Sequence, residues 1–153
     1  MIVVSACLYG FNCKYNGNNN RIGEIVNSLN EEDCIFVCPE VLGGLGIPRI
    51  TSERKGNRSI QKNGEDVTSH FHLGAKKALE KCEGKKIDFV LLKAKSPSCG
   101  SGIIYDGSFS GKLIEGDGVF AEYCKDKRYL VIDEVEFVRR KEYYVSLISS
   151  GKD

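Results

Sequence analysis

The strongest strand signal in this 153-residue chain is Ile87-Asp88-Phe89-Val90-Leu91-Leu92, followed after three residues by Ser96-Pro97-Ser98-Cys99-Gly100. Its first part is rich in apolar, β-branched and aromatic residues and predicts a strand. Its second part holds Pro and Gly, which force an irregular backbone directly after that strand. The pairing of this strand, together with the irregular segment after it, therefore decides the architecture.

Strands and helices alternate on both sides of this junction. Further strands are predicted at 2–6, 34–37 and 129–132, and helices at 22–29, 68–82, 116–124 and 133–148. Such alternation is typical of a parallel sheet covered by helices on both faces. We therefore expect one α/β domain over residues 1–153, a three-layer Rossmann-like sandwich with a mostly parallel sheet of four or five strands.

Two segments do not follow this alternation. Residues 39–66 show turn residues and no sustained periodicity, and a long irregular stretch in a small domain is more often functional than idle. We expect it to be a loop that covers a site. Residues 103–105, followed by Asp106-Gly107, are predicted as a hairpin arm.

Composition limits the kind of partner. The 22 basic and 21 acidic residues leave a formal charge of +1, so no global field attracts a long nucleic acid or an anionic membrane. No apolar run approaches the ~20 residues of a membrane span, and the first residues lack the features of a signal peptide. We expect a soluble, cytoplasmic protein, in which the seven cysteines are core residues, metal ligands or reactive thiols.

Cysteines follow the ends of three predicted strands. Ligands of such sheets bind at the carboxyl ends of the strands. With the first strand between the second and third, Cys7, Cys38 and Cys99 would meet at one rim, and Cys13 can join them from the first loop. The four are separated by 5, 24 and 60 residues without a C-x-x-C pair, which argues against zinc ribbons and thioredoxin-like dithiols. Soft thiolates at long spacings suit an iron-sulfur cluster, and three ligands would leave one iron open.

The alternative for any of these cysteines is an ordinary buried thiol. We prefer that interpretation for Cys34, Cys82 and Cys124, which lie on apolar faces of predicted elements. Cys38 is intermediate, because it has the same strand parity as Cys34 and can extend the buried face.

Polar residues and glycines lie beside these cysteines. Glu40 comes after a buried strand and a proline, so it is a candidate general acid or base, with a solvated loop carboxylate as the alternative. Ser96 and Ser98 either hydrogen-bond a ligand or complete a tight turn. Gly43 and Gly44 allow close approach of backbone to a planar base or a phosphate, although turns use glycine equally. The basic segment 49–62 either meets a nucleotide phosphate or is solvated.

Several blocks, in order, are similar to the thiouracil desulfidase family. They are Ser5-Ala6-Cys7-Leu8, Asn12-Cys13-Lys14-Tyr15, Val37-Cys38-Pro39-Glu40-Val41-Leu42-Gly43-Gly44-Leu45, Gly64-Glu65-Asp66-Val67-Thr68, Lys95-Ser96-Pro97-Ser98-Cys99-Gly100 and Ile104-Tyr105-Asp106-Gly107-Ser108-Phe109-Ser110-Gly111. The resemblance runs from Met1 to about Glu134.

The resemblance implies a 4Fe-4S cluster held by three cysteines, whose fourth iron binds the sulfur of a thiolated pyrimidine. It implies Cys7, Cys13 and Cys99 as ligands, with Cys38 as the alternative third. Sulfur would leave as hydrosulfide without net redox chemistry.

The resemblance also implies roles for residues beside the cluster. Glu40 would position or activate water, and Ser96 would hold the base. We further expect Ser98, Gly43, Gly44 and Asp106 to contact the substrate.

The expected substrate is a thiolated base or nucleotide such as thiouracil or a thiouridine nucleotide, rather than a long nucleic acid. Two other classes stay open at this point. One is a zinc or redox-thiol protein that uses the same cysteines, and the other is a nucleotide-binding module without catalysis. The sequence leaves the oligomeric state undetermined.

Overall fold

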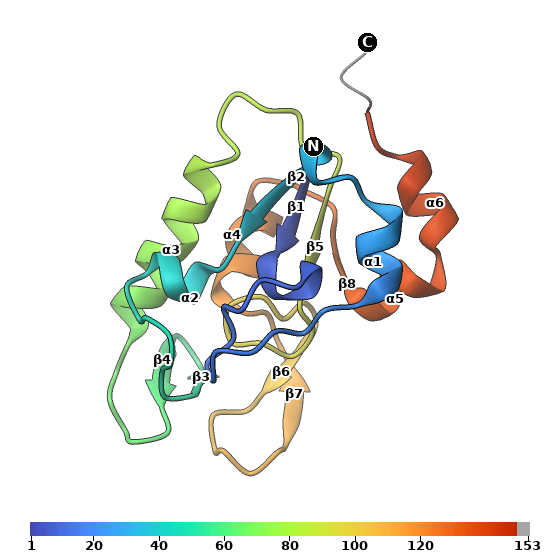
Figure 1. Cartoon of the computed structure of the whole chain (residues 1–153). Coiled ribbons are helices and arrows are strands. Elements are labelled where there is room, and N and C mark those ends of the chain that lie inside the picture. Colours follow the sequence, from blue (N-terminus) through green and yellow to red (C-terminus); the bar gives the residue numbers. More distant parts are fainter. Residues whose placement is uncertain (150–153) are drawn as a thin grey trace.

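The computed structural model describes residues 1–149, so the last four residues of the predicted domain lie outside the described part. Its centre is a sheet of four parallel strands in the order β2-β1-β5-β8 (Figure 1). These strands are β1 (Ile2–Ser5), β2 (Cys34–Val37), β5 (Phe89–Leu92) and β8 (Val131–Asp133). The first strand lies between the second and the third main strand, which is the order that the expected meeting of the cysteines requires.

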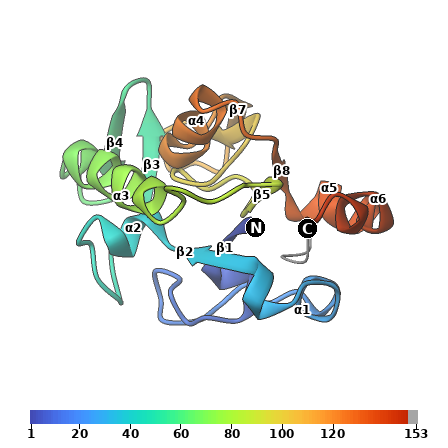
Figure 2. The ribbon, with the colours of Figure 1, turned by 90° about the horizontal axis from the view of Figure 1, so that it is seen from above.

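Helices cover both faces of this sheet (Figure 2). On one face lie α3 (Thr68–Glu80) and α4 (Val119–Asp126), and on the other α1 (Gly23–Ser28), α5 (Glu134–Arg139) and α6 (Lys141–Ser146). Successive strand residues point to opposite faces, so β1 supplies Val3 to one core cluster and Ile2 and Val4 to the other. The three-layer α/β architecture is confirmed.

The central strand β1 is buried along its whole length. Val3 pairs with Ile35 on one side and Val90 on the other, and all three side chains are buried. Full burial of one large apolar side chain stabilises a fold by about 1.5–3 kcal/mol. The sheet is therefore the rigid part of the molecule from which the site is built.

The predicted loop at 39–66 contains regular structure, and this expectation is wrong in part. It holds the short helix α2 (Pro39–Leu42) and an antiparallel hairpin of β3 (Ser52–Lys55) and β4 (Arg58–Gln61). A four-residue helix is too short to show a helical period. The hairpin strands are mostly polar because they form a separate two-stranded ribbon rather than part of the core sheet.

The predicted hairpin arm is confirmed. It is β6 (Ile103–Tyr105), which pairs antiparallel with β7 (Leu113–Glu115). Figure 1 shows this ribbon and the β3–β4 hairpin on the same side of the molecule, beyond the carboxyl ends of the central strands.

The predicted last helix is two helices. Asp133 accepts a hydrogen bond from the backbone N–H of Glu136 at 2.9 Å, which confirms the predicted N-cap. The helix is interrupted at Arg140, whose φ of −127° and ψ of 40° are not helical. The change of direction allows Tyr144 of α6 to pack against Phe89 and Phe137. Within residues 1–149, no helix combines the length and apolar character needed to cross a membrane.

Helices α2 and α3 meet at two glycines. A Cβ added to Gly74 would lie 1.8 Å from the carbonyl oxygen of Pro39, and one added to Gly43 would lie 2.0 Å from that of His70. Neither position can hold a side chain without separation of the two helices. This contact fixes α2, and with it Glu40, against α3.

We expect Gly74→Ala to destabilise the protein by about 3 kcal/mol, the upper end for overpacking, and to lower the Tm by roughly 6–10 °C. Thermal unfolding followed by circular dichroism measures this. Gly23→Ala in α1 is the matched control, because the nearest atom to its added Cβ is the flexible Arg21 Nη1 at 3.9 Å. An unchanged Tm in Gly74→Ala would contradict the close packing of α2 on α3.

Candidate functional site

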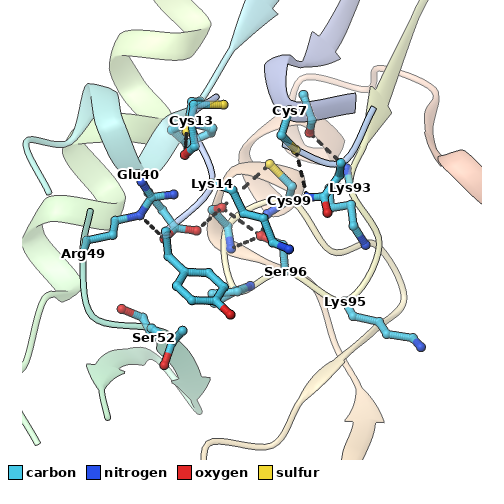
Figure 3. A pocket seen from close by; sticks show the side chains of 18 of the residues that line it. Cys7, Cys13, Lys14, Glu40, Arg49, Ser52, Lys93, Lys95, Ser96 and Cys99 are labelled. Carbon is cyan, nitrogen blue, oxygen red and sulfur yellow. Dashed lines mark hydrogen bonds and ion pairs between the residues drawn. The ribbon is translucent and has the colours of Figure 1, made fainter. Parts of the chain in front are cut away.

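The carboxyl ends of β1, β2 and β5 open into one pocket of about 620 Å³ (Figure 3). Its walls come from the segments directly after these strands, from the first loop, and from residues of the β3 and β6 hairpins. This is the position at which parallel α/β sheets bind ligands. Segments far apart in the sequence therefore contribute to a single cavity.

The four cysteines predicted to meet at this rim all line the pocket. Cys7 comes after β1, Cys38 after β2 and Cys99 after β5, and Cys13 comes from the first loop. Their predicted convergence is confirmed. Among residues 1–149, no three His, Cys, Asp or Glu side chains gather closely enough about one point to hold a single metal ion.

Cys13 interacts with the side chains of both Cys7 and Cys38. A hydrogen bond from Cys13 lowers the pKa of Cys7, and the Asn20 side-chain amide adds a second donor at 3.4 Å. Interaction with the Cys13 side chain also lowers the pKa of Cys38 to about 7, with help from the Val41 backbone N–H. As a neutral thiol, Cys38 donates to the Cys13 carbonyl oxygen at 3.6 Å. The pKa of Cys13 itself is raised, because its single thiol proton is stabilised by the sulfur of either Cys38 or Cys7.

Cys99 is in a different environment. Burial raises the pKa of its thiol to about 12, although hydrogen bonds from Ser5 and Ser98 oppose this effect. The Ser98 hydroxyl lies 3.7 Å from the sulfur. Cys7 and Cys38 are thus the two thiols that most readily become thiolates, the form in which cysteine binds metals.

Glu40 lies in the first turn of α2 and is held at both oxygens. Its Oε1 accepts a hydrogen bond from Arg49 Nε at 3.2 Å, and its Oε2 accepts one from Ser98 Oγ at 2.9 Å. The Arg49 and Glu40 side chains are only 6% and 14% exposed. The carboxylate is therefore a fixed, partly desolvated group rather than a solvated loop residue.

Ser96 extends this network. Its hydroxyl lies 3.0 Å from Ser98 Oγ and accepts hydrogen bonds from the backbone N–H groups of Ser98 and Cys99. Ser96 thus completes the tight turn that places Cys99, while its own proton is available to Ser98 or to a ligand. The structure confirms that Ser96 completes a tight turn, and contact of these serines with a ligand stays a prediction.

The pocket is rich in basic side chains. Lys14, Lys62, Lys93 and Lys95 line it together with Arg49. Lys93 forms an ion pair with the largely buried Glu134 at 3.0 Å. The sequence shows only that the segment 49–62 is basic. It does not reveal the pairing of Arg49 with Glu40, because the two residues are nine positions apart in a segment without periodicity.

Three predicted substrate contacts are not among the described residues that line the pocket: Gly43, Gly44 and Asp106. Gly43 serves the contact of α2 with α3, and Gly44 has the left-handed φ of 91°. Asp106 accepts hydrogen bonds from the backbone N–H and hydroxyl of Ser108, which also lower its pKa. Local structure explains these residues, and their contact with a substrate stays a prediction.

The remaining cysteines are away from the pocket. Cys82 and Cys124 are buried, as predicted, whereas Cys34 is only half-buried against the second core cluster. Burial raises the pKa of all three, that of Cys34 to about 12. In measurements of thiol reactivity, these three cysteines serve as controls for the four that line the pocket.

Comparison with known proteins agrees with this geometry. A family model described as 2-thiouracil desulfurase matches residues 2–136. The chain belongs to the 2-thiouracil desulfurase family. It is 41% identical over 146 residues to the uncharacterized protein YbbK of Bacillus subtilis strain 168, an alignment that covers 89% of this chain and 97% of YbbK.

A solved structure with the same fold is that of the [4Fe-4S]-dependent thiouracil desulfidase TudS. The two structures superpose with a TM-score of 0.86 and 38% identity, over 96% of this chain and 98% of TudS. This member of the 2-thiouracil desulfurase family thus has the architecture of TudS, and the family resemblance seen in its motifs is confirmed.

In metal-free protein, Cys38 should react with iodoacetamide faster than Cys82 and Cys124 at pH 7. With a pKa of about 7 it is roughly half thiolate there, and its rate should fall about fivefold when the pH falls to 6. Peptide mapping by mass spectrometry measures each rate. Cys13→Ala should move the midpoint of the Cys38 profile upward and Cys34→Ala should not. Equal rates at Cys38 and Cys82 would contradict the hydrogen bond from Cys13.

Proposed function

We propose that this protein is a [4Fe-4S]-dependent desulfidase, which replaces the sulfur of a thiolated pyrimidine by oxygen and releases hydrosulfide. The observation that carries this proposal is the meeting of four cysteines and the held carboxylate of Glu40 in one pocket. The 38% identity to TudS over nearly the whole chain supports it. The alternatives, a zinc or redox-thiol protein and a binding module without catalysis, are outcomes of the reconstitution test.

The donor set fits an iron-sulfur cluster, since such clusters are held by cysteine thiolates. Cys7, Cys13 and Cys99 are the proposed ligands, with Cys38 as the alternative third. All four line the pocket, so either set fits. When bound, a cluster with three protein ligands supplies an open Lewis-acidic iron that accepts the substrate sulfur.

Glu40 is the proposed base for the incoming water. Its carboxylate takes a proton from water while the water oxygen bonds to the thiocarbonyl carbon. The carbon–sulfur bond then breaks and sulfur leaves as hydrosulfide, so the carbon is neither oxidised nor reduced. Arg49 and Ser98 hold the two carboxylate oxygens and keep them aimed through this step.

Ser96 and Ser98 connect this base to the bound ring. Ser96 already accepts two backbone hydrogen bonds, so its hydroxyl is best used as a donor to the substrate. Ser98 donates to Glu40 and is the proposed second contact. Both serines are fixed by the turn after β5.

The basic wall of the pocket favours a base or nucleotide over a long nucleic acid. Lys14, Lys62 and Lys95 provide local positive charge suited to one phosphate group, on a chain whose formal charge is only +1. Thiouracil and a thiouridine monophosphate are the substrates to compare.

The test is anaerobic reconstitution with iron and sulfide. We expect about four irons per chain and absorbance at ~400 nm. We also expect release of sulfide with formation of uracil from 2-thiouracil. Replacement of a ligand by serine should abolish both iron binding and turnover, whereas Cys34→Ser should preserve both. Comparison of Cys7→Ser, Cys13→Ser, Cys38→Ser and Cys99→Ser identifies the ligand set. Bound zinc without iron, or affinity for uridine nucleotides without turnover, would instead support the alternatives.

Glu40→Gln should lower turnover by about 10²–10⁴-fold, the usual contribution of a general acid or base, and leave the iron content unchanged. Gln has nearly the same shape and keeps one acceptor oxygen, for Arg49 or Ser98, but it cannot take a proton from water. Sulfide release and iron analysis on the same preparation measure both effects. Glu24→Gln, in the first turn of α1, is the control. A wild-type rate in Glu40→Gln would exclude Glu40 as the base.

A further inference from the structure

Ser52, at the start of β3, has a hydroxyl with no hydrogen-bond partner among the described residues. The residue is only 7% exposed. A buried hydroxyl without a partner costs free energy, and native proteins seldom leave one. Ser59 on the neighbouring strand β4 is the second such case, at 0% exposed.

The two serines differ in their position relative to the pocket. Ser52 lines it, whereas Ser59 is not among the described residues of its wall. Figure 3 shows Ser52 at the end of the pocket away from Cys7, Cys13 and Cys99. Ser52 therefore borders the pocket, so a group bound there is the candidate partner for its hydroxyl, whereas Ser59 lies outside this wall.

The residue next to Ser52 builds an aromatic wall at the same site. Glu53 Oε1 accepts hydrogen bonds from the backbone N–H groups of Gly107 and Phe109, both at 3.0 Å. Phe109 has a φ of 56°, a left-handed conformation that aromatic residues rarely adopt. The strand β3 thus holds the loop between β6 and β7 in a strained conformation. Phe109 and Tyr105 from this loop both line the pocket.

The hairpin that carries Ser52 is itself anchored. Arg54 donates to the carbonyl oxygen of Asp117 at 2.6 Å and pairs with Glu122 at 2.7 Å. A Cβ on Gly107 would lie 2.7 Å from that of Lys55, so loop and strand are in close contact. Ser52 therefore has a fixed position in a pocket wall that also includes two aromatic residues, as suits recognition of a flat heterocycle.

We infer that Ser52 is a specificity-determining residue, whose hydroxyl hydrogen-bonds the polar edge of the pyrimidine that does not carry the reacting sulfur. The inference rests on the proposed function. With the sulfur toward the cysteines, the polar groups of the other ring edge, a carbonyl oxygen and a ring N–H, face the opposite end of the pocket. A hydroxyl can donate to the carbonyl oxygen or accept from a ring N–H, so it suits either group.

The test compares Ser52→Ala with Ser59→Ala in reconstituted protein. Each variant removes one buried hydroxyl without a partner from the same hairpin, so neither should lower the Tm. We expect Ser52→Ala to raise the KM for 2-thiouracil and the Kd for uracil by about three- to tenfold, the usual effect of one neutral hydrogen bond. Its kcat and iron content should stay near wild type. Ser59→Ala should change none of these values.

A substrate analogue provides a second measurement. 2-Thiopyrimidine lacks the carbonyl oxygen of 2-thiouracil but keeps the sulfur. Wild type should bind 2-thiouracil more tightly than this analogue, and Ser52→Ala should reduce the difference, because a site built to hydrogen-bond a polar group rejects the analogue without it. The KM values for both compounds, measured by sulfide release with wild type and both serine variants, give the three ratios.

An unchanged KM and Kd in Ser52→Ala would overturn the inference, and so would equal changes in both serine variants, which would indicate hairpin packing. Failure of the proposed function is a separate result, since wild-type protein would then release no sulfide from 2-thiouracil. Wild-type turnover combined with an unaffected Ser52→Ala variant rejects only the role of Ser52.

Discussion

The parallel pairing of β1 with both β2 and β5 is the constraint on which the rest of the structure depends. Val3 is in register with Ile35 and Val90, so the three strands end at the same edge of the sheet. The segments directly after them are separated by dozens of residues in the sequence. Their cysteines share one pocket because the backbone ladder holds the strand ends together.

Packing on one face of the sheet then fixes the position of the carboxylate. Gly43 and Gly74 allow α2 to lie directly against α3, and Glu40 projects from the first turn of α2. The Arg49 and Ser98 hydrogen bonds connect it to the loop before β3 and to the turn after β5. The proposed base is thus held from three separate segments, which is the preorganisation that water activation requires.

The same pocket combines opposite chemical environments. Cys7 and Cys38 have lowered pKa values because the one thiol proton of Cys13 can be donated to either of them, whereas burial raises the pKa of Cys99. Away from this end, β3 contributes the hydroxyl of Ser52, which has no partner among the described residues, and the carboxylate of Glu53 that holds Phe109. We interpret the first end as the site of cluster chemistry and the second as the site of ring recognition.

Local periodicity predicted the main strands and helices, and the rule that parallel strands end together predicted which cysteines meet once the first strand lies between the second and third. The sequence by itself also determined the family, through motifs that need no coordinates. Three features could be seen only in the folded protein: Arg49 pairs with Glu40, Gly43 serves helix packing, and the Ser52 hydroxyl finds no partner within the described residues. These facts depend on contacts between segments whose own patterns are irregular or polar, such as the ribbon of β3 and β4. Local propensity and periodicity describe the chain within a few residues, whereas the pairing of side chains across a pocket is set by how the elements pack.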